Sequence, residues 1–143
     1  MEKILIIDDE PQIRALLRDI LVREGFTVED ASDGRVGLAM WSKKPADLVL
    51  TDIFMPNKDG IEIIMELKRS WPYAKIIAMT GGGQMNLREM ESAASFLGAN
   101  RTLEKPFDRQ SLLAVIRSVL DERGPAHKSV ASANGEMAVM ASK

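Results

Sequence analysis

Cysteine is absent from this chain of 143 residues, which excludes a disulfide framework and any thiolate metal site. A strong excess of one charge is also missing. The 19 Lys and Arg against 21 Asp and Glu leave a net charge of -2, and no basic stripe stands out for binding a nucleic-acid backbone. The first apolar run, residues 4–7, is too short for a signal sequence or a membrane span. These absences predict a cytoplasmic protein without direct nucleic-acid or membrane contact.

Short apolar runs alternate with segments of helical periodicity, the pattern of an α/β protein with a parallel sheet. The predicted strands cover residues 3–7, 26–31, 47–51, 75–79 and 101–104. The predicted helices cover residues 11–25, 34–42, 61–70, 86–97 and about 108–120. Five strand-helix units indicate one domain over residues 1–123. Residues 124–143, mostly small residues and Met without clear period, predict a flexible tail.

Charged residues follow several of the predicted strands. Asp8 and Asp9 come after the first strand, Asp52 after the third and Lys105 after the fifth. Ligands of parallel sheets collect at the carboxyl ends of the strands, so these side chains are expected to share one site. Crowded carboxylates repel one another unless a cation and a lysine neutralise them. The residues therefore suggest a magnesium-dependent phosphoryl site.

Further motifs accompany these residues in order. They are IIDDEP at residues 6–11, LTDIFMP at 50–56, DG at 59–60, TG at 80–81, GA at 98–99 and KPF at 105–107. With this set, the chain resembles the receiver domain of two-component response regulators from Met1 to about Arg123. The resemblance implies a doubly wound, flavodoxin-like sheet of strand order 2-1-3-4-5 with five helices.

The resemblance also implies roles for the acidic residues. Asp52 would be the nucleophile that takes a phosphoryl group from a phosphohistidine on a sensor histidine kinase or phosphotransfer protein, since a carboxylate is ionised at neutral pH. Asp9 would bind Mg2+ directly and Asp8 mainly through water, with the backbone carbonyl of Phe54 as another ligand. The alternatives are that Asp52 caps a loop and that Asp8 and Asp9 cap the helix before Pro11.

Two more residues complete the implied site. The Thr80 hydroxyl would donate to a phosphoryl oxygen, and Lys105 would pair first with Asp52 and then with the phosphoryl group. The alternatives are a strand-end turn hydroxyl for Thr80 and a solvated surface lysine for Lys105. The family carries a cis bond before the residue that is Pro106 here, and such a bond fixes the direction of the Lys105 side chain.

Two features depart from the family pattern. The family usually has an aromatic residue three positions before the lysine, where this chain has Thr102. The segment from Thr80 to Gly98 is also longer than usual by about three residues, and the extra length lies at the triple glycine of residues 81–83. The loop and helix after the fourth strand are therefore expected to be atypical.

The predicted function is a phosphorylation switch that is no enzyme beyond its own phosphoryl transfer and autodephosphorylation. An unidentified output protein would bind the face formed by residues 86–97, the fifth strand and the last helix. One alternative is a receiver excised from a larger regulator or hybrid kinase. Another is an aspartate-nucleophile phosphatase, which typically has a second Asp where this chain has Phe54. A nucleotide-binding module is disfavoured because no phosphate loop is present.

Overall fold

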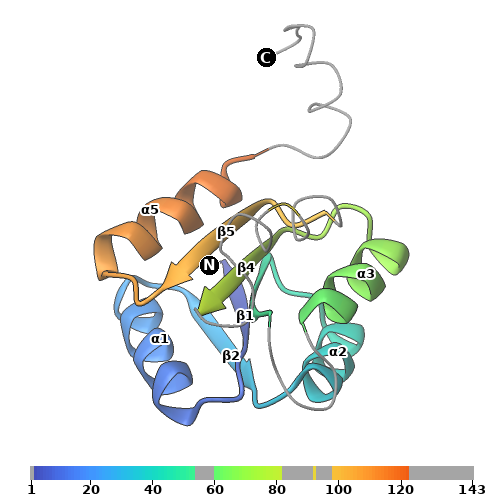
Figure 1. Ribbon diagram of the computed structural model, residues 1–143, viewed down its shortest axis with the longest axis horizontal. Helices are drawn as coiled ribbons and strands as arrows, with labels where there is room; N and C mark the ends of the chain where they lie inside the picture. Colours follow the sequence, from blue (N-terminus) through green and yellow to red (C-terminus); the bar gives the residue numbers. More distant parts are fainter. Residues whose placement is uncertain (1, 54–59, 82–91, 93–97, 123–143) are drawn as a thin grey trace, which may run out of the picture.

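The computed structural model describes residues 2–53, 60–81, 92 and 98–122, and it shows a twisted parallel sheet between two layers of helices (Figure 1). The strands are β1 (Lys3–Ile7), β2 (Thr27–Ala31), β3 (Leu48–Asp52), β4 (Ile76–Gly81) and β5 (Arg101–Lys105). They pair in parallel in the order β2-β1-β3-β4-β5. This result confirms the predicted α/β class, the strands and their order.

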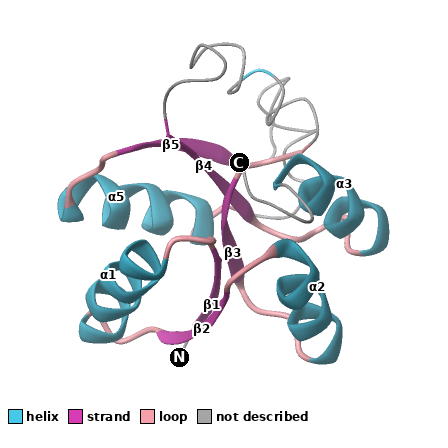
Figure 2. Ribbon diagram, turned by 60° about the horizontal axis from the view of Figure 1, so that its bottom comes forward, coloured by secondary structure: helices cyan, strands magenta, loops and turns pink. Residues whose placement is uncertain are grey.

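The described helices are α1 (Pro11–Arg23), α2 (Gly34–Lys43), α3 (Gly60–Ser70) and α5 (Arg109–Leu120). Both ribbon views place α1 and α5 on one face of the sheet and α2 and α3 on the other (Figures 1 and 2). The predicted helix over residues 86–97, apart from Ser92, and the predicted tail over residues 124–143 lie outside the described residues. Among the residues that are described, no helix has the length and apolar character needed to cross a membrane.

Side-chain chemistry at the helix ends explains several boundaries. Asp33 accepts a hydrogen bond from the Val36 N–H at the start of α2, and Asp108 accepts one from Ser111 at 2.7 Å at the start of α5. These bonds satisfy backbone donors that have no partner inside the helix. The bond from Ser111 also lowers the pKa of Asp108 below its ordinary value. Asp108, at the predicted start of the last helix, therefore caps α5.

Because helices cover both faces of the sheet, the strands carry an apolar core on each side. In β1, Ile4 and Ile6 belong to the core on the side of α1 and α5, whereas Leu5 and Ile7 belong to the core on the side of α2 and α3. All four side chains are at most 2% exposed. The alternation along each strand thus fixes the face toward which every strand residue points.

This alternation also directs the polar residues at the strand ends. Leu50 in β3 and Leu103 in β5 lie in the core beneath α1 and α5. Asp52 and Lys105 follow two residues later in the same strands and therefore point toward the same face. The carboxyl ends of β3 and β5 consequently direct a carboxylate and an ammonium group into one region.

Candidate functional site

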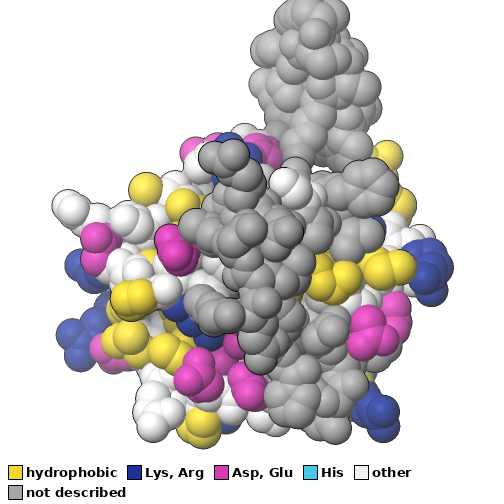
Figure 3. Space-filling model, viewed as in Figure 1, with side chains coloured by type: hydrophobic (Ala, Val, Ile, Leu, Met, Phe, Trp, Pro, Cys, Tyr) yellow, Lys and Arg dark blue, Asp and Glu magenta, His cyan; other side chains and the backbone are white. Residues whose placement is uncertain are grey.

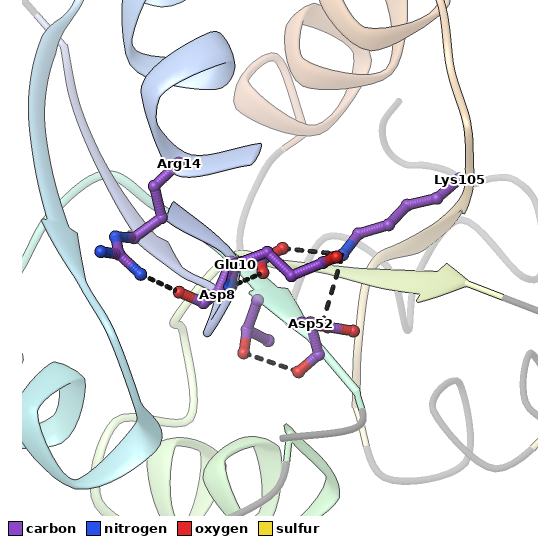
Figure 4. Close-up of polar contacts among 6 residues, drawn as sticks. Asp8, Glu10, Arg14, Asp52 and Lys105 are labelled. Atoms are coloured by element: carbon purple, nitrogen blue, oxygen red, sulfur yellow. Dashed lines mark hydrogen bonds and ion pairs between the residues drawn. The ribbon is translucent and has the colours of Figure 1, made fainter. Parts of the chain in front are cut away.

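Three residues from distant parts of the sequence meet at the carboxyl edge of the sheet. Asp8 directly follows β1, Asp52 is the last residue of β3, and Lys105 is the last residue of β5. The Lys105 Nζ atom lies 2.8 Å from Asp8 Oδ2 and 3.3 Å from Asp52 Oδ2 (Figure 4). The lysine therefore bridges two carboxylates that stand at the ends of two neighbouring strands.

A third carboxylate, which sequence reasoning had not singled out, takes part in the same cluster. Glu10 Oε1 lies 3.3 Å from Lys105 Nζ. Ligand atoms of Asp8, Glu10 and Asp52 all lie within 4.8 Å of one another, a spacing suited to binding one cation. The signal that could have revealed Glu10 is its place directly after the acidic pair of the IIDDEP motif.

Burial increases the strength of these interactions. Asp8 is fully buried, Asp52 is 7% exposed, and the side chain of Lys105 is 12% exposed. Burial by itself would lower the pKa of Lys105, but the hydrogen bond to Asp8 and the charges of Asp52 and Asp8 raise it above its ordinary value. Lys105 thus keeps its positive charge at neutral pH and offsets the repulsion between the carboxylates.

The local structure around Asp8 fixes this carboxylate in place. Its Oδ1 accepts a hydrogen bond from the Glu10 N–H at 2.9 Å, and its backbone carbonyl accepts one from Arg14 Nη1 at 2.7 Å. Helix α1 itself begins after Glu10, with Pro11 in its first turn and no side-chain capping bond. Asp8 therefore stabilises the turn before α1 and does not cap the helix.

Asp9 lies beside the cluster. Together with Glu10, Asp52, Gly81 and Lys105, it lines a hollow of about 280 Å³ over the strand ends. Asp9 is half-buried and is not one of the three carboxylates that approach within 4.8 Å. Phe54, whose carbonyl was predicted as a further ligand, lies outside the described residues. The structure thus brings Asp9 to the rim of the predicted site.

Thr80 stands near the end of β4 with a hydroxyl that has no hydrogen-bond partner among the described residues. The residue is only 1% exposed, so its hydroxyl is shielded from solvent. Thr80 shares the sheet face of Ala78, opposite which Thr102 lies half-buried in β5. The Lys105-Pro106 peptide bond is cis, as the resemblance implied.

Carboxylate oxygens are the ligands that Mg2+ prefers, and the cluster supplies three of them around a single ammonium group. The donor set therefore fits a small divalent cation. Phosphoryl chemistry on a carboxylate requires the same combination of acidic groups and a lysine. This edge of the sheet therefore groups three carboxylates that could hold one cation beside the Lys105 ammonium group.

Comparison with known proteins decides between the possible families. The family model for the response regulator receiver domain matches residues 4–117. This chain belongs to that family. The match includes the residues of the cluster and leaves only the two ends of the chain outside.

Relatives of this receiver domain include regulators of different length. The transcriptional regulatory protein CpxR of Klebsiella pneumoniae is 37% identical, with 84% of this chain and 50% of the relative covered. Sporulation initiation phosphotransferase F of Bacillus subtilis is 35% identical over 83% of this chain and 94% of its own length. The chain thus spans about half the length of CpxR and nearly all of the second relative.

Solved receiver domains share the fold. The receiver domain protein of Clostridium thermocellum has a TM-score of 0.78 and 32% identity, with 84% of this chain and 94% of that chain covered. Chemotaxis protein CheY4 of Vibrio cholerae has a TM-score of 0.76 and 29% identity, with 83% of this chain and 98% of that chain covered. The receiver fold of these two solved structures therefore covers more than four fifths of this chain.

Proposed function

We propose that this receiver domain is a phosphorylation switch in which Asp52 accepts a phosphoryl group from a phosphohistidine on a sensor histidine kinase or phosphotransfer protein. The observation that carries the proposal is the Lys105 ammonium group, 3.3 Å from Asp52 Oδ2 and 2.8 Å from Asp8 Oδ2 at the edge of the sheet. A buried nucleophilic carboxylate beside a fixed cation is suited to phosphoryl transfer. A solvated surface lysine would not be held by three carboxylates.

The chemical step needs little covalent assistance from the protein. A carboxylate oxygen of Asp52 attacks phosphorus, the bond between phosphorus and the imidazole nitrogen breaks, and the imidazole leaves with the electron pair and takes up a proton. The Lys105 ammonium group, paired with the Asp52 carboxylate before transfer, then pairs with the new phosphoryl oxygens. The Thr80 hydroxyl, which has no other partner among the described residues, donates to one of those oxygens. Mg2+ supplies neutralisation of the phosphoryl charge when it is bound.

The proposed ligands of Mg2+ are Asp9 and Asp52 directly, Asp8 mainly through water, and the Phe54 carbonyl. Asp8 and Asp52 belong to the observed carboxylate cluster, and Asp9 lines the adjoining hollow. Glu10 also contributes a carboxylate to that cluster. Its side chain is 57% exposed and contacts Lys105, so we assign it to charge balance and not to the inner ligand set.

The domain is proposed to signal by binding another protein. It is proposed to catalyse only its own phosphoryl transfer and autodephosphorylation. Acidic and basic side chains of the described residues are interspersed on the face shown in Figure 3, and the net charge of the chain is -2, which favours an output through protein. The proposed contact face combines β5, α5 and the segment at residues 86–97. Because Thr102 lacks an aromatic ring, signal propagation must depend on Thr80 and the segment that follows it.

A small phosphodonor tests the proposed function. Phosphoramidate, which contains a bond between phosphorus and nitrogen, is expected to transfer one phosphoryl group per chain in the presence of Mg2+. Removal of Mg2+ with EDTA is expected to reduce the rate at least tenfold, because the carboxylate cluster then repels the incoming anion. Intact-mass measurements over time give both rates. Modification at the same rate with and without Mg2+ would exclude a metal-dependent receiver mechanism.

Substitution of individual acidic residues tests the proposed ligand set. Asp9→Asn is expected to weaken Mg2+ binding at least tenfold, while the melting temperature without Mg2+ stays equal or rises because one repelling charge is gone. Glu10→Gln is the matched comparison and is expected to weaken binding about threefold, since its exposed carboxylate acts through water. Calorimetric titration measures both affinities. If Glu10→Gln lost more Mg2+ affinity than Asp9→Asn, Glu10 would be the direct ligand and Asp9 would serve charge balance. If Asp9→Asn had a lower melting temperature and unchanged Mg2+ affinity, Asp9 would have a structural role.

A further inference from the structure

The two tryptophans and the one tyrosine of the chain gather at a single hollow. Trp41, Trp71 and Tyr73 line this hollow, which has a volume of about 580 Å³. Asp47, directly before β3, and Lys75, directly before β4, also line it. The hollow therefore lies at the amino edge of the sheet, opposite the edge that carries the phosphorylation site.

The aromatic wall has a fixed part and an open part. The rings of Trp41 and Trp71 pack edge to face, with centroids 6.0 Å apart and an interplanar angle of 78°. Trp41 is only 3% exposed, and its indole N–H has no hydrogen-bond partner among the described residues. Tyr73, by contrast, is 69% exposed. Tyrosine is enriched at protein interfaces, and Tyr73 is the most accessible ring of this hollow.

The charges around the hollow favour a cation. Asp47 Oδ2 accepts a hydrogen bond from the backbone N–H at the start of β1 at 2.7 Å, and Asp47 has no ion-pair partner in the described part of the chain. Glu2, on the same wall, approaches Arg117 only at 4.0 Å. Lys75 donates from its ammonium group to the carbonyl of Leu120, which also lines the hollow, at 2.7 Å. Among the residues that line the hollow, the carboxylates of Glu2 and Asp47 thus outnumber the single ammonium group of Lys75, which already has an acceptor.

The fold itself adds to this negative character. In a parallel α/β fold every helix ends at the amino edge of the sheet, and α2, α3 and α5 end there at Lys43, Ser70 and Leu120. Helix carboxyl ends carry partial negative charge and unsatisfied carbonyl groups. Carbonyl groups of the loop after α3 bind a cation at this edge, because the Lys68 ammonium group donates to the carbonyls of Pro72 and Ala74 at 3.2 and 2.7 Å. The edge is therefore a favourable environment for one more cation.

We propose that this hollow binds an arginine side chain on an exposed segment of a partner protein. A guanidinium group stacks on an aromatic ring and also donates to a carboxylate, which an ammonium group does less well. Here Tyr73 and Trp71 offer the rings, and Asp47 offers the carboxylate. A partner protein is favoured over a free small molecule because the exposed Tyr73 leaves the hollow open, whereas small-molecule sites enclose most of their ligand.

Intrinsic fluorescence tests the proposal directly, because both tryptophans of the chain lie at this hollow. The probe is the peptide acetyl-Ala-Leu-Arg-Leu-Ala-amide, and its partner probe carries citrulline, a neutral analogue of nearly the same shape, in place of arginine. The arginine peptide is expected to change tryptophan emission with a saturable curve and to bind at least fivefold more tightly than the citrulline peptide. Equal binding of the two peptides, or no change in emission, would overturn the proposal.

Variants locate the binding within the hollow. Asp47→Asn is expected to lower the affinity for the arginine peptide about tenfold, and Tyr73→Ala is expected to lower it about threefold. Tyr73 is mainly exposed, so its variant keeps the test decisive if Asp47→Asn fails to fold. Met65→Ala, a change at a 43% exposed residue of α3, is the matched control and should bind as wild type. Unchanged affinity in Tyr73→Ala would overturn the proposal.

A further probe separates the two sources of a guanidinium group. N-acetylarginine amide offers the same side chain without the flanking residues and is expected to bind at least fivefold more weakly than the peptide. Equal affinity of N-acetylarginine amide and the arginine peptide would show that the hollow binds a small cation and not a segment of a partner protein. Because the hollow lies at the edge opposite Asp52, Asp52→Asn should bind the peptide as wild type does. Failure of this proposal would therefore leave the phosphorylation proposal intact.

Discussion

Replacement of Asp52 by asparagine is expected to reduce phosphoryl incorporation from phosphoramidate and Mg2+ to the detection limit. An amide oxygen carries no negative charge and is a poor nucleophile, whereas the aspartate carboxylate is ionised at neutral pH. Of the three clustered carboxylates, Asp52 alone is itself a strand residue, whereas Asp8 and Glu10 follow β1 in the turn before α1, where the Glu10 N–H donates to Asp8 Oδ1. Intact-mass measurement of the two proteins under identical conditions gives the result.

Asp47→Asn is the matched control for this experiment. Asp47 immediately precedes β3, and Asp52 ends the same strand, so the two substitutions remove the same charge at opposite edges of the sheet. The Asp47 variant is expected to take up phosphate at the wild-type rate, provided that its melting curve shows a folded protein. If Asp52→Asn were modified as fully as wild type, another side chain would be the acceptor and the proposed mechanism would be wrong.

The second large effect is expected from Gly60→Ala. A Cβ atom on Gly60 would lie 2.1 Å from the Asp52 carbonyl oxygen and 2.6 Å from Ile53 Cα. Both are backbone atoms next to the phosphorylation site, and they cannot move aside as the tip of a side chain can. The Gly60 N–H also donates to the Ile53 carbonyl at 2.7 Å. Gly60 thus fixes the start of α3 directly against the end of β3.

The expected cost of this clash is about 3 kcal/mol of folding free energy, because the overlap forces the backbone of β3 or α3 to shift. For a domain of this size, the melting temperature should fall by roughly 10 °C. Phosphorylation of the remaining folded protein should also slow, since the Asp52 carbonyl and carboxylate move together. Thermal melting and phosphoramidate kinetics on the same samples separate the two effects.

Gly25→Ala provides the comparison. Gly25 has φ +98°, and a Cβ atom there would meet no heavy atom within 4 Å. The substitution therefore carries only the cost of a left-handed backbone, about 1 kcal/mol, and leaves the phosphorylation rate unchanged. If Gly60→Ala had the melting temperature of wild type, the contact between α3 and β3 would be looser than described.

The resting charge arrangement has a consequence for switching. Lys105 contacts Asp8, Glu10 and Asp52 at once, so transfer of a phosphoryl group to Asp52 offers the lysine a more highly charged partner. In the proposed mechanism, Thr80 also gains an acceptor that it lacks among the described residues before transfer. A phosphoryl group shifts a conformational equilibrium only through contacts that differ between the two states. The Lys105 and Thr80 contacts supply such differences.

Local sequence patterns were sufficient for the framework of the fold. Short apolar runs and segments of helical periodicity predicted all five strands and the four described helices with small shifts at their ends. The same patterns placed Asp8, Asp52 and Lys105 at strand ends. These predictions succeed because hydrophobic periodicity and capping depend on neighbours within a few positions along the chain.

Contacts between distant side chains were decided only by the tertiary structure. No local pattern distinguishes Glu10 from Asp9 as the closer partner of Lys105, because that choice depends on how the turn before α1 faces β5, 95 residues away. The contact of Gly60 with the Asp52 carbonyl and the meeting of Trp41 with Trp71 have the same origin. The sequence by itself determined which residues reach each edge of the sheet, and packing between the elements decided which of them touch.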